Sequence, residues 1–278
     1  MNSGTVSILG CGWLGVPLGK HLRNRRFSVK GSVTTPEKFG LLRTSGIVPY
    51  RFVLSEIDAE LEDPTFLETD VLIISIPPRR IDGIERIFPA QITQLIPLIL
   101  KSGVKKVIFI SSTSVYPENL QTASEDDELF PDKASGKACL YAENLLKNLT
   151  DFETTIIRFG GLIGADRNPA RFLLKSDRAI ANIPVNLIHQ DDCVAIISAI
   201  LEQDLWGETL NACCPEHPLK KEFYGKAAQI SGLPVPLISD QTEAYKIVDS
   251  SKLKRLLKYK FKYQSPMDYL DSLVTSKM

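Results

Sequence analysis

The sequence predicts an α/β fold with a doubly wound parallel sheet and a smaller C-terminal substrate region. Three observations support this prediction. Strand-sized apolar runs alternate with helix-length amphipathic stretches from the N-terminus onward, as in βαβ units. The run 71–76 is almost entirely apolar and mostly β-branched, as expected for a central strand buried on both faces. A glycine-rich turn joins the first expected strand to the first expected helix.

The elements of the sheet follow from these patterns in order. The expected strands are residues 5–9, 27–33, 48–53, 71–76, 107–111 and 154–158, and six strands suffice for a doubly wound sheet. The expected helices are 14–23, 36–46, 89–101 with a bend at Pro97, and 134–149. Pro36 suits the first position of its helix, and Gly46 suits the left-handed residue after the last turn. The third strand is the weakest prediction because Pro49 interrupts it.

After Gly164 the pattern becomes irregular, so we divide the chain into residues 1–165 and a smaller region, 166–278, interleaved with the first. In the second region we expect a helix through Phe172 and Leu174, then a strand at 185–189. Asp191 or Asp192 is the expected N-cap of the next helix. Further helices are expected around 221–230, 251–257 and 267–274.

Composition limits the classes of partner. Lysine plus arginine and aspartate plus glutamate both total 33, so no global basic field exists to attract nucleic acid or anionic lipid. No apolar run approaches the roughly 20 residues of a membrane span, and no secretory leader pattern is evident, so we expect a cytoplasmic protein. The five cysteines form no metal-ligand spacing, and we interpret them as reduced packing residues with no metal site.

The glycine-rich turn matches the pattern G-x-G-x-x-G and runs through Gly10, Cys11, Gly12, Trp13, Leu14 and Gly15. The first glycine permits a tight turn, the second lets a diphosphate approach the backbone, and the third lets the helix pack close to the strand. Amides at the helix start then face the phosphates. The pattern therefore predicts a Rossmann-type NAD(P) site, and a purely structural turn is the alternative.

The second strand bears on the choice of cofactor. NAD-binding sites of this type commonly carry an acidic residue about 20 residues after the turn, which holds the ribose hydroxyls. Here that place holds hydroxyls and a nearby cation, namely Thr34, Thr35 and Lys38. A 2′-phosphate would meet no acidic repulsion, so we expect NADP in preference to NAD. The alternative for Lys38 is an ordinary solvated lysine.

Three further segments resemble the extended and atypical short-chain dehydrogenases/reductases, especially NAD-dependent epimerase/dehydratase-like proteins. Residues 110–116 resemble the family's S-S-x-x-V-Y segment, residues 156–164 its R-x-G-x-x-x-G stretch, and residues 189–192 its H-x-x-D segment. The resemblance covers nearly the whole chain. It implies an oxidoreductase, epimerase or dehydratase that acts on a small-molecule substrate, often a nucleotide sugar, and a homodimer by analogy.

The resemblance also implies roles for particular residues. Ser112 would hydrogen-bond a substrate oxygen. The cofactor would be contacted by Ile76, Pro77, Pro78 and Ser111 after the central strands, and its nicotinamide half by Phe159, Gly160 and Gly161.

The family's Y-x-x-x-K pair, in which lysine lowers the tyrosine pKa, is missing. When the chain is aligned so that Glu143 takes the glutamate of the family's K-x-x-x-E spacing, Ser135 falls at the tyrosine position and Cys139 at the lysine position. Three readings stay open. Substitute groups such as Tyr116, or Tyr141 with Lys137, could sustain catalysis. Ser112 and the cofactor could suffice for different chemistry. Alternatively, the protein could bind NADP without turnover, as a sensor or scaffold.

Cationic residues suggest where a substrate could bind. Arg79 and Arg80 follow the fourth strand at the carboxyl edge of the sheet, where open α/β folds bind ligands, and could clamp a phosphate or carboxylate. Arg167 and Arg171 offer a second clamp, and His189 could border the cofactor. A solvated loop is the alternative for each arginine pair.

Overall fold

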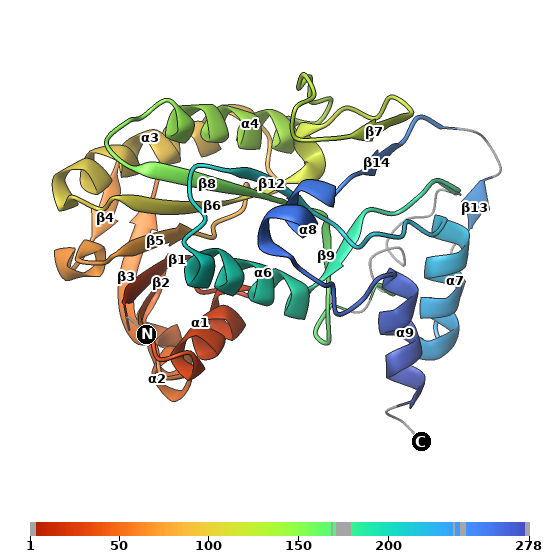
Figure 1. Cartoon of the computed structure of the whole chain (residues 1–278), viewed down its shortest axis with the longest axis horizontal. Coiled ribbons are helices and arrows are strands. Elements are labelled where there is room, and N and C mark those ends of the chain that lie inside the picture. The colour runs from red at the N-terminus through yellow and green to blue at the C-terminus, as the bar shows by residue number, and fades with distance from the viewer. Residues whose placement is uncertain (1–3, 168, 171–178, 236, 240–242, 276–278) are drawn as a thin grey trace. The chain divides into compact units, whose positions relative to one another are not determined.

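The computed structural model describes residues 4–167, 169–170, 179–235, 237–239 and 243–275 (Figure 1). The chain forms two compact units. Unit 1 comprises Met1–Val115, Leu129–Arg158 and Ile197–Leu210, and unit 2 comprises Tyr116–Glu128, Phe159–Ile196 and Asn211–Met278. Each unit therefore combines segments that are far apart in the sequence.

The central sheet has eight strands in the order β12-β8-β6-β5-β1-β2-β3-β4. Pairing is parallel from β3 through β2, β1 and β5 to β6, and antiparallel between β3 and β4. This arrangement confirms the α/β fold class. The strands are β1 Thr5–Leu9, β2 Ser28–Val33, β3 Val48–Leu54, β4 Ala59–Leu61, β5 Val71–Ile74, β6 Lys106–Ser112, β8 Glu153–Phe159 and β12 Thr209–Ala212.

The prediction of six strands was wrong, because β4 and β12 extend the sheet at its two edges. Both are short, at three and four residues, and neither has a strand-length apolar alternation of its own. Strand β3 tolerates Pro49 because pairing with β4 covers only Phe52–Leu54. Among the described strands, none pairs with the β4-facing edge of β3 at Pro49, and an edge position is where a sheet accepts proline.

Helices cover the sheet in unit 1, and Figure 1 shows α3 and α4 side by side along one face. The elements are α1 Gly15–Asn24, the 3₁₀ turn η1 Pro36–Lys38, α2 Phe39–Thr44, η2 Pro64–Leu67, α3 Ile84–Ser102 and α4 Ala134–Lys147. The expected helix at 36–46 is thus split into η1 and α2, and Gly46 has the predicted positive φ of 73°. Helix α3 begins at Ile84 and contains Pro89 as well as Pro97.

One hydrophobic core cluster of unit 1 includes residues of the sheet and of helices α3 and α4. Leu72 and Ile74 of β5 and Phe109 of β6 are fully buried there against Phe88 and Ile92 of α3. Burial of such side chains contributes about 1.5–3 kcal/mol each. The apolar run at 71–76 therefore forms the centre of the sheet, as the sequence predicted, although the strand itself ends at Ile74.

Unit 2 is built from short parallel strand pairs and four helices among its described residues. The strand pairs are β7 Gln121–Ala123 with β14 Lys246–Val248, β9 Gly161–Ile163 with β11 Leu187–His189, and β10 Ile180–Ala181 with β13 Ile238–Ser239. The helices are α6 Gln190–Gln203, which continues into unit 1, α7 Lys220–Ser231, α8 Ser251–Leu257 and α9 Pro266–Thr275. The predicted helices at 221–230, 251–257 and 267–274 are confirmed within one residue at each end.

Two predictions for this region have a different outcome. The N-cap assignment to Asp191 or Asp192 was wrong, because α6 begins at Gln190 and both aspartates lie inside its first turn. The carboxylate of Asp192 instead accepts hydrogen bonds from the Tyr259 hydroxyl and the Lys262 amide. The predicted helix through Phe172 and Leu174 lies outside the described residues.

Three properties of the described residues bear on function. No helix there is both long and apolar enough to cross a bilayer. No group of histidine, cysteine, aspartate and glutamate side chains there is arranged to hold a metal ion. All five cysteines are buried as free thiols.

Candidate functional site

The glycine-rich turn leaves β1 through a backbone that needs glycine at two places. Gly10 has φ +99°, and a Cβ there would come within 2.8 Å of Ile76 Cγ2. A Cβ on Gly15, the first residue of α1, would lie 2.7 Å from the carbonyl oxygen of Gly10. The turn and the close start of the helix therefore both exclude larger side chains.

Gly12 lies between them in a different environment. It is exposed, and a Cβ there would meet no atom within 4 Å. Its lack of a side chain is thus unexplained by packing and leaves open space beside the backbone. A diphosphate fits this arrangement, because phosphates bind backbone amides at the start of a helix.

Strand β2 holds the turn in place. Ser32 Oγ accepts a hydrogen bond from the Gly10 amide at 3.1 Å, and the Ser32 carbonyl accepts one from the Cys11 amide at 2.8 Å. The Cys11 side chain is buried against Gly31, where an added Cβ would lie 2.5 Å from the sulfur. Burial raises the pKa of Cys11 to about 12, so this thiol is a packing group.

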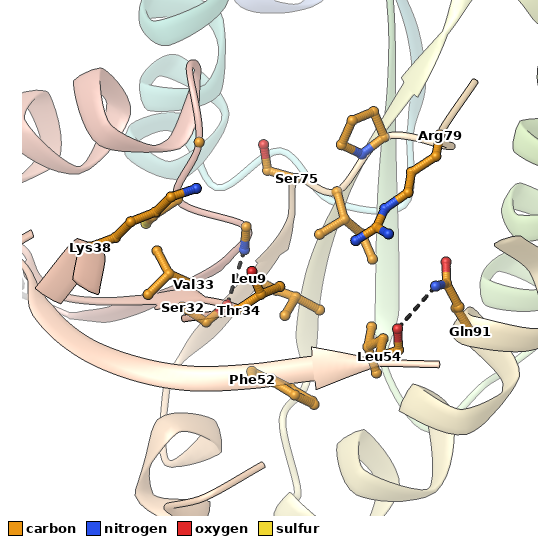
Figure 2. Close-up of a pocket in the computed structure, with 15 residues that line it drawn as sticks. Leu9, Ser32, Val33, Thr34, Lys38, Phe52, Leu54, Ser75, Arg79 and Gln91 are labelled. Atoms are coloured by element: carbon orange, nitrogen blue, oxygen red, sulfur yellow. Dashed lines mark hydrogen bonds between the residues drawn. The ribbon is translucent and has the colours of Figure 1, made fainter. Parts of the chain in front are cut away.

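A pocket of about 260 Å³ opens beside the turn, entirely within unit 1. Figure 2 shows its lining residues, which come from the ends of β1, β2, β3 and β5 and from α3. Its volume is near the lower limit of roughly 300 Å³ for small-molecule sites, which suits part of a dinucleotide. The lining residues are Leu9, Gly10, Cys11, Gly12, Ser32, Val33, Thr34, Lys38, Phe52, Leu54, Ser75, Ile76, Pro77, Arg79 and Gln91.

Seven of the residues predicted to bind cofactor thus line one pocket, and the lining does not include the others. Trp13, Leu14, Gly15, Thr35, Pro78 and Ser111 lie elsewhere in unit 1, and Phe159, Gly160 and Gly161 belong to unit 2. The Thr35 hydroxyl is engaged by Glu37: hydrogen bonds from the Glu37 backbone and from Thr35 lower the pKa of that carboxyl. Of the two threonines, Thr34 is therefore the one that faces the pocket.

The two arginines that were expected to clamp a substrate, Arg79 and Arg80, differ in their relation to the pocket. Arg79 lines the pocket beside the glycine-rich turn, whereas Arg80 is not among the lining residues. For the second expected clamp, the structure places the Arg167 amide in a hydrogen bond to the Gly164 carbonyl, and Arg171 lies outside the described residues.

A buried ion pair lies at the ends of β6 and β8. Glu143 of α4 accepts two hydrogen bonds on Oε2 from Arg158, at 2.7 Å from the terminal nitrogen and 3.2 Å from Nε. The Ser111 hydroxyl donates to Glu143 Oε1. Glu143 is 1% exposed and Arg158 is 4% exposed, so water does not compete for these contacts. Ser111 is thus oriented by a charged acceptor.

The residues at the family's catalytic positions lie near this pair. Ser112 is half-buried, and its hydroxyl oxygen accepts the Ser114 amide at 3.1 Å. Cys139 is buried, and burial, reinforced by the Glu143 carboxylate, raises its pKa to about 12. Ser135 is half-buried near the start of α4. The Cys139 thiol therefore stays protonated at neutral pH and cannot take the place of a charged lysine.

The start of α4 packs tightly beside these residues. A Cβ on Gly136 would come within 2.1 Å of the Ser114 carbonyl oxygen, so the helix backbone approaches η3 (Thr113–Val115) closely. Gly136 permits this approach because it has no Cβ. The exposed Tyr141 and Lys137 lie on the outer side of the same helix.

Tyr116 belongs to unit 2 and is 1% exposed. Its hydroxyl donates to Asn211 Oδ1 at 2.8 Å, and its carbonyl accepts the buried ammonium of Lys246 at 2.8 Å. A phenol held this way has a structural role within unit 2.

Gly160 and Gly161, which the resemblance places beside the nicotinamide, have packing partners in unit 2. A Cβ on Gly160 would lie 2.6 Å from Cys213 Sγ, and one on Gly161 would lie 2.7 Å from Leu187 Cδ2. His189 is buried between Tyr263 and Tyr269, at ring distances of 4.6 and 4.5 Å, and its Nδ1 accepts the Asp191 amide. Burial lowers its pKa, so the ring is a neutral packing element at neutral pH.

Sequence reasoning missed several pocket residues. Ser32 was passed over in favour of the threonines that follow it, and Phe52, Leu54 and Gln91 come from elements with no recognisable motif. Gln91 donates to the Leu54 carbonyl at 3.0 Å, which fixes α3 to the end of β3 (Figure 2). Only the hydroxyl of Ser32, next to the expected cofactor residues, could have been found from the sequence.

Known proteins resemble this chain over nearly its whole length. The protein YeeZ of Escherichia coli (strain K12) is 31% identical over 266 residues, which cover 94% of this chain and 97% of YeeZ. No protein-family model matches the chain.

Solved structures share the fold. A short-chain dehydrogenase/reductase superfamily protein from Agrobacterium tumefaciens with bound NAD has a TM-score of 0.77 and 19% identity, covering 98% of this chain and 97% of that one. MoeE5 in complex with UDP-glucose and NAD has a TM-score of 0.77 and 19% identity, covering 99% and 100%. The chain therefore belongs to the family of YeeZ and has the fold of the short-chain dehydrogenase/reductase superfamily, as its sequence motifs had indicated.

Proposed function

We propose that this protein binds a nicotinamide dinucleotide, NADP in preference to NAD, and acts as an epimerase/dehydratase-like enzyme or reductase. The observation that carries the proposal is the open backbone at Gly12 beside a pocket that has no carboxylate among its lining residues. The fold neighbours with NAD and with UDP-glucose support this class of cofactor and a small polar substrate such as a nucleotide sugar.

A bound nicotinamide would supply hydride transfer, and the protein residues would position the substrate. Ser112 is half-buried, and its hydroxyl, whose oxygen accepts the Ser114 amide, would donate its proton in a hydrogen bond to a substrate oxygen. The end of β6 just before Ser112 is fixed by hydrogen bonds, because Ser111 donates to Glu143, which also accepts from Arg158. The proton would not be moved by a Tyr-x-x-x-Lys pair, because the sequence has no such pair.

A second function is favoured by the state of Cys139. The residue at the position of the family's lysine is a buried thiol with a pKa near 12, which supplies no positive charge to activate a proton donor. A catalytically silent protein that binds NADP and reports cofactor state to a partner agrees with this environment.

Cofactor binding is tested with NADPH and NADH titrations of the wild type and of Gly12→Val. We expect both nucleotides to raise the melting temperature, NADPH at lower concentration. A ligand at 100 times its Kd adds about 2.7 kcal/mol of stability. Gly12→Val should fold with little change in melting temperature, because a Cβ there meets no atom, but should lose nucleotide binding.

The matched control is Gly225→Val in α7, where an added Cβ also meets nothing within 4 Å. It should bind nucleotide like the wild type. If the wild type had no affinity for either nucleotide, the assignment of a dinucleotide site would be lost.

Turnover distinguishes the two functions. An enzyme should oxidise NADPH slowly with some member of a panel of sugars and carbonyl compounds, and Ser112→Ala should reduce that rate. A sensor should bind NADPH, turn over no member of the panel and change its oligomeric state when the cofactor is added.

A further inference from the structure

We propose that Arg79 and Lys38 together hold the 2′-phosphate of NADP, which makes Arg79 a residue that determines cofactor specificity. The inference rests on the proposed NADP preference and deepens it by adding a second cation from a different strand. It also moves Arg79 from the substrate side, where the sequence had suggested it, to the adenosine side of the cofactor.

The sheet order brings the two residues to one pocket. Lys38 ends η1, which follows β2, and Arg79 follows β5. Strands β2 and β5 flank β1 on its two sides, so the segments after them lie on either side of the glycine-rich turn. In Figure 2 both side chains extend into the space between them, from opposite walls of the pocket.

The charges of this pocket are unbalanced. Its lining contains Lys38 and Arg79 but no aspartate or glutamate. Within the described part of the chain, neither side chain forms an ion pair. Both side chains are exposed, and what distinguishes them from other exposed cations of the unit is that they line one pocket. Two cations left without a carboxylate partner in one pocket favour an anionic ligand.

The rest of the lining indicates which anion. Gly10 and Gly12 mark the place of the diphosphate, and Phe52, Leu54 and Ile76 give an apolar surface suited to adenine and ribose. An anionic group held by Lys38, Arg79 and the Thr34 hydroxyl would then belong to the adenosine part of the ligand, where NADP carries its 2′-phosphate.

Arg79 could instead stack on adenine, and the two roles differ in a measurable way. Stacking of a guanidinium on an aromatic ring does not depend on a 2′-phosphate, so it would strengthen NADH and NADPH alike. A phosphate contact strengthens only the ligand that carries the phosphate. Discrimination between the two ligands therefore identifies the role.

The experiment uses two small probes of the adenosine half, adenosine 2′,5′-bisphosphate and 5′-AMP, titrated calorimetrically. The variants are Arg79→Gln and Lys38→Gln, with Arg80→Gln as the matched control, because Arg80 adjoins Arg79 and is not among the residues that line the pocket. We expect Arg79→Gln and Lys38→Gln each to weaken the bisphosphate about tenfold or more, the effect of losing a hydrogen bond to a charged group. Binding of 5′-AMP should change less than twofold by our estimate, and Arg80→Gln should leave both ligands unchanged.

Two results would overturn the assignment: an equal loss for both probes in Arg79→Gln, which identifies stacking on adenine or contact with the 5′-phosphate that both probes carry, or no loss for either. Wild-type protein that binds NADH more tightly than NADPH would also overturn it, while leaving the dinucleotide site itself intact. Failure of the proposed function has a separate signature, namely wild-type protein that binds neither NADPH nor NADH.

Discussion

Ser32 Oγ accepts a hydrogen bond from the Gly10 amide at 3.1 Å, which ties the end of β2 to the glycine-rich turn. Ser32→Ala leaves this partly buried amide without its acceptor, and we expect a loss of about 1–2 kcal/mol of stability. NADPH affinity should fall as well, because Gly10 loses one of its restraints. Chemical denaturation and an NADPH titration measure the two effects.

Ser28→Ala is the control for this prediction, because Ser28 lies exposed at the start of the same strand. It should change neither stability nor binding beyond experimental error. Unchanged NADPH affinity in Ser32→Ala would show that the turn keeps its conformation without this hydrogen bond.

The buried pair of Glu143 and Arg158 leads to a second prediction. Arg158→Met leaves the Glu143 carboxylate buried without its cation, and we expect a loss of about 3–5 kcal/mol in a urea unfolding experiment. The double variant Glu143→Leu/Arg158→Met should recover much of this loss, because no unpaired charge remains.

The exposed ion pairs of Arg51 serve as the control for that experiment. Arg51 contacts Glu60 and Glu62, which are each more than half exposed, and Arg51→Met should cost less than about 1 kcal/mol. Equal losses for Arg51→Met and Arg158→Met would contradict the importance of burial at Glu143.

The cysteines should be unreactive in the native protein. All five are buried, and burial raises the pKa of Cys11, Cys139 and Cys214 to about 12. At pH 7.5 almost no thiolate is present, so a colorimetric thiol reagent should label none of them until denaturant is added, and all five afterwards. Rapid labelling of one native thiol at this pH, assigned by peptide mapping, would disprove the expectation and show an accessible nucleophile.

The lowered pKa values of the histidines lead us to expect a loss of stability in mild acid. Burial is the leading cause that lowers the pKa of His21, His189 and His217 below the ordinary value of 6.5. Below pH 6.5 the histidines therefore bind protons more readily in the unfolded chain than in the folded chain. The neutral histidines stabilise the folded chain fully above pH 6.5, and this contribution is lost as the pH falls below that value. The melting temperature should decrease from pH 7.5 to pH 5.5.

His189→Asn tests the part that comes from one ring. Asparagine Oδ1 can accept the Asp191 amide in place of Nδ1, so the turn is kept while the titrating group is removed. This variant should show a smaller decrease over the same pH range. An identical pH dependence in wild type and variant would assign the effect to other groups.

Much of the fold is legible in local sequence. Strand β1 and helix α8 have the bounds that the residues predicted, because a buried strand and an amphipathic helix show their period over a few residues. The glycine-rich turn was equally clear, since Gly10 and Gly15 are required by contacts with neighbours close in the chain or in the adjoining strand.

Other features have no local signal. The β4 strand is three residues long, and β12 joins β8 after an intervening helix, so both depend on pairing rather than on their own composition. The N-cap role assigned to Asp192 failed for a similar reason. Its carboxylate serves a segment around residue 262, which no short-range pattern connects to it.

The sequence by itself determined the class of sheet, the glycine-rich turn between the first strand and the first helix, and the absence of the tyrosine and lysine pair, since each is visible in neighbouring residues. Only the tertiary structure decided that Ser32 restrains Gly10, that Thr34 faces the pocket while Thr35 is held by Glu37, and that Arg79 shares this pocket with Lys38. The contact of Ser32 with Gly10 and the shared pocket of Arg79 and Lys38 bring together segments of separate strands, and the order and register of a parallel sheet arise from long-range packing and hydrogen bonds.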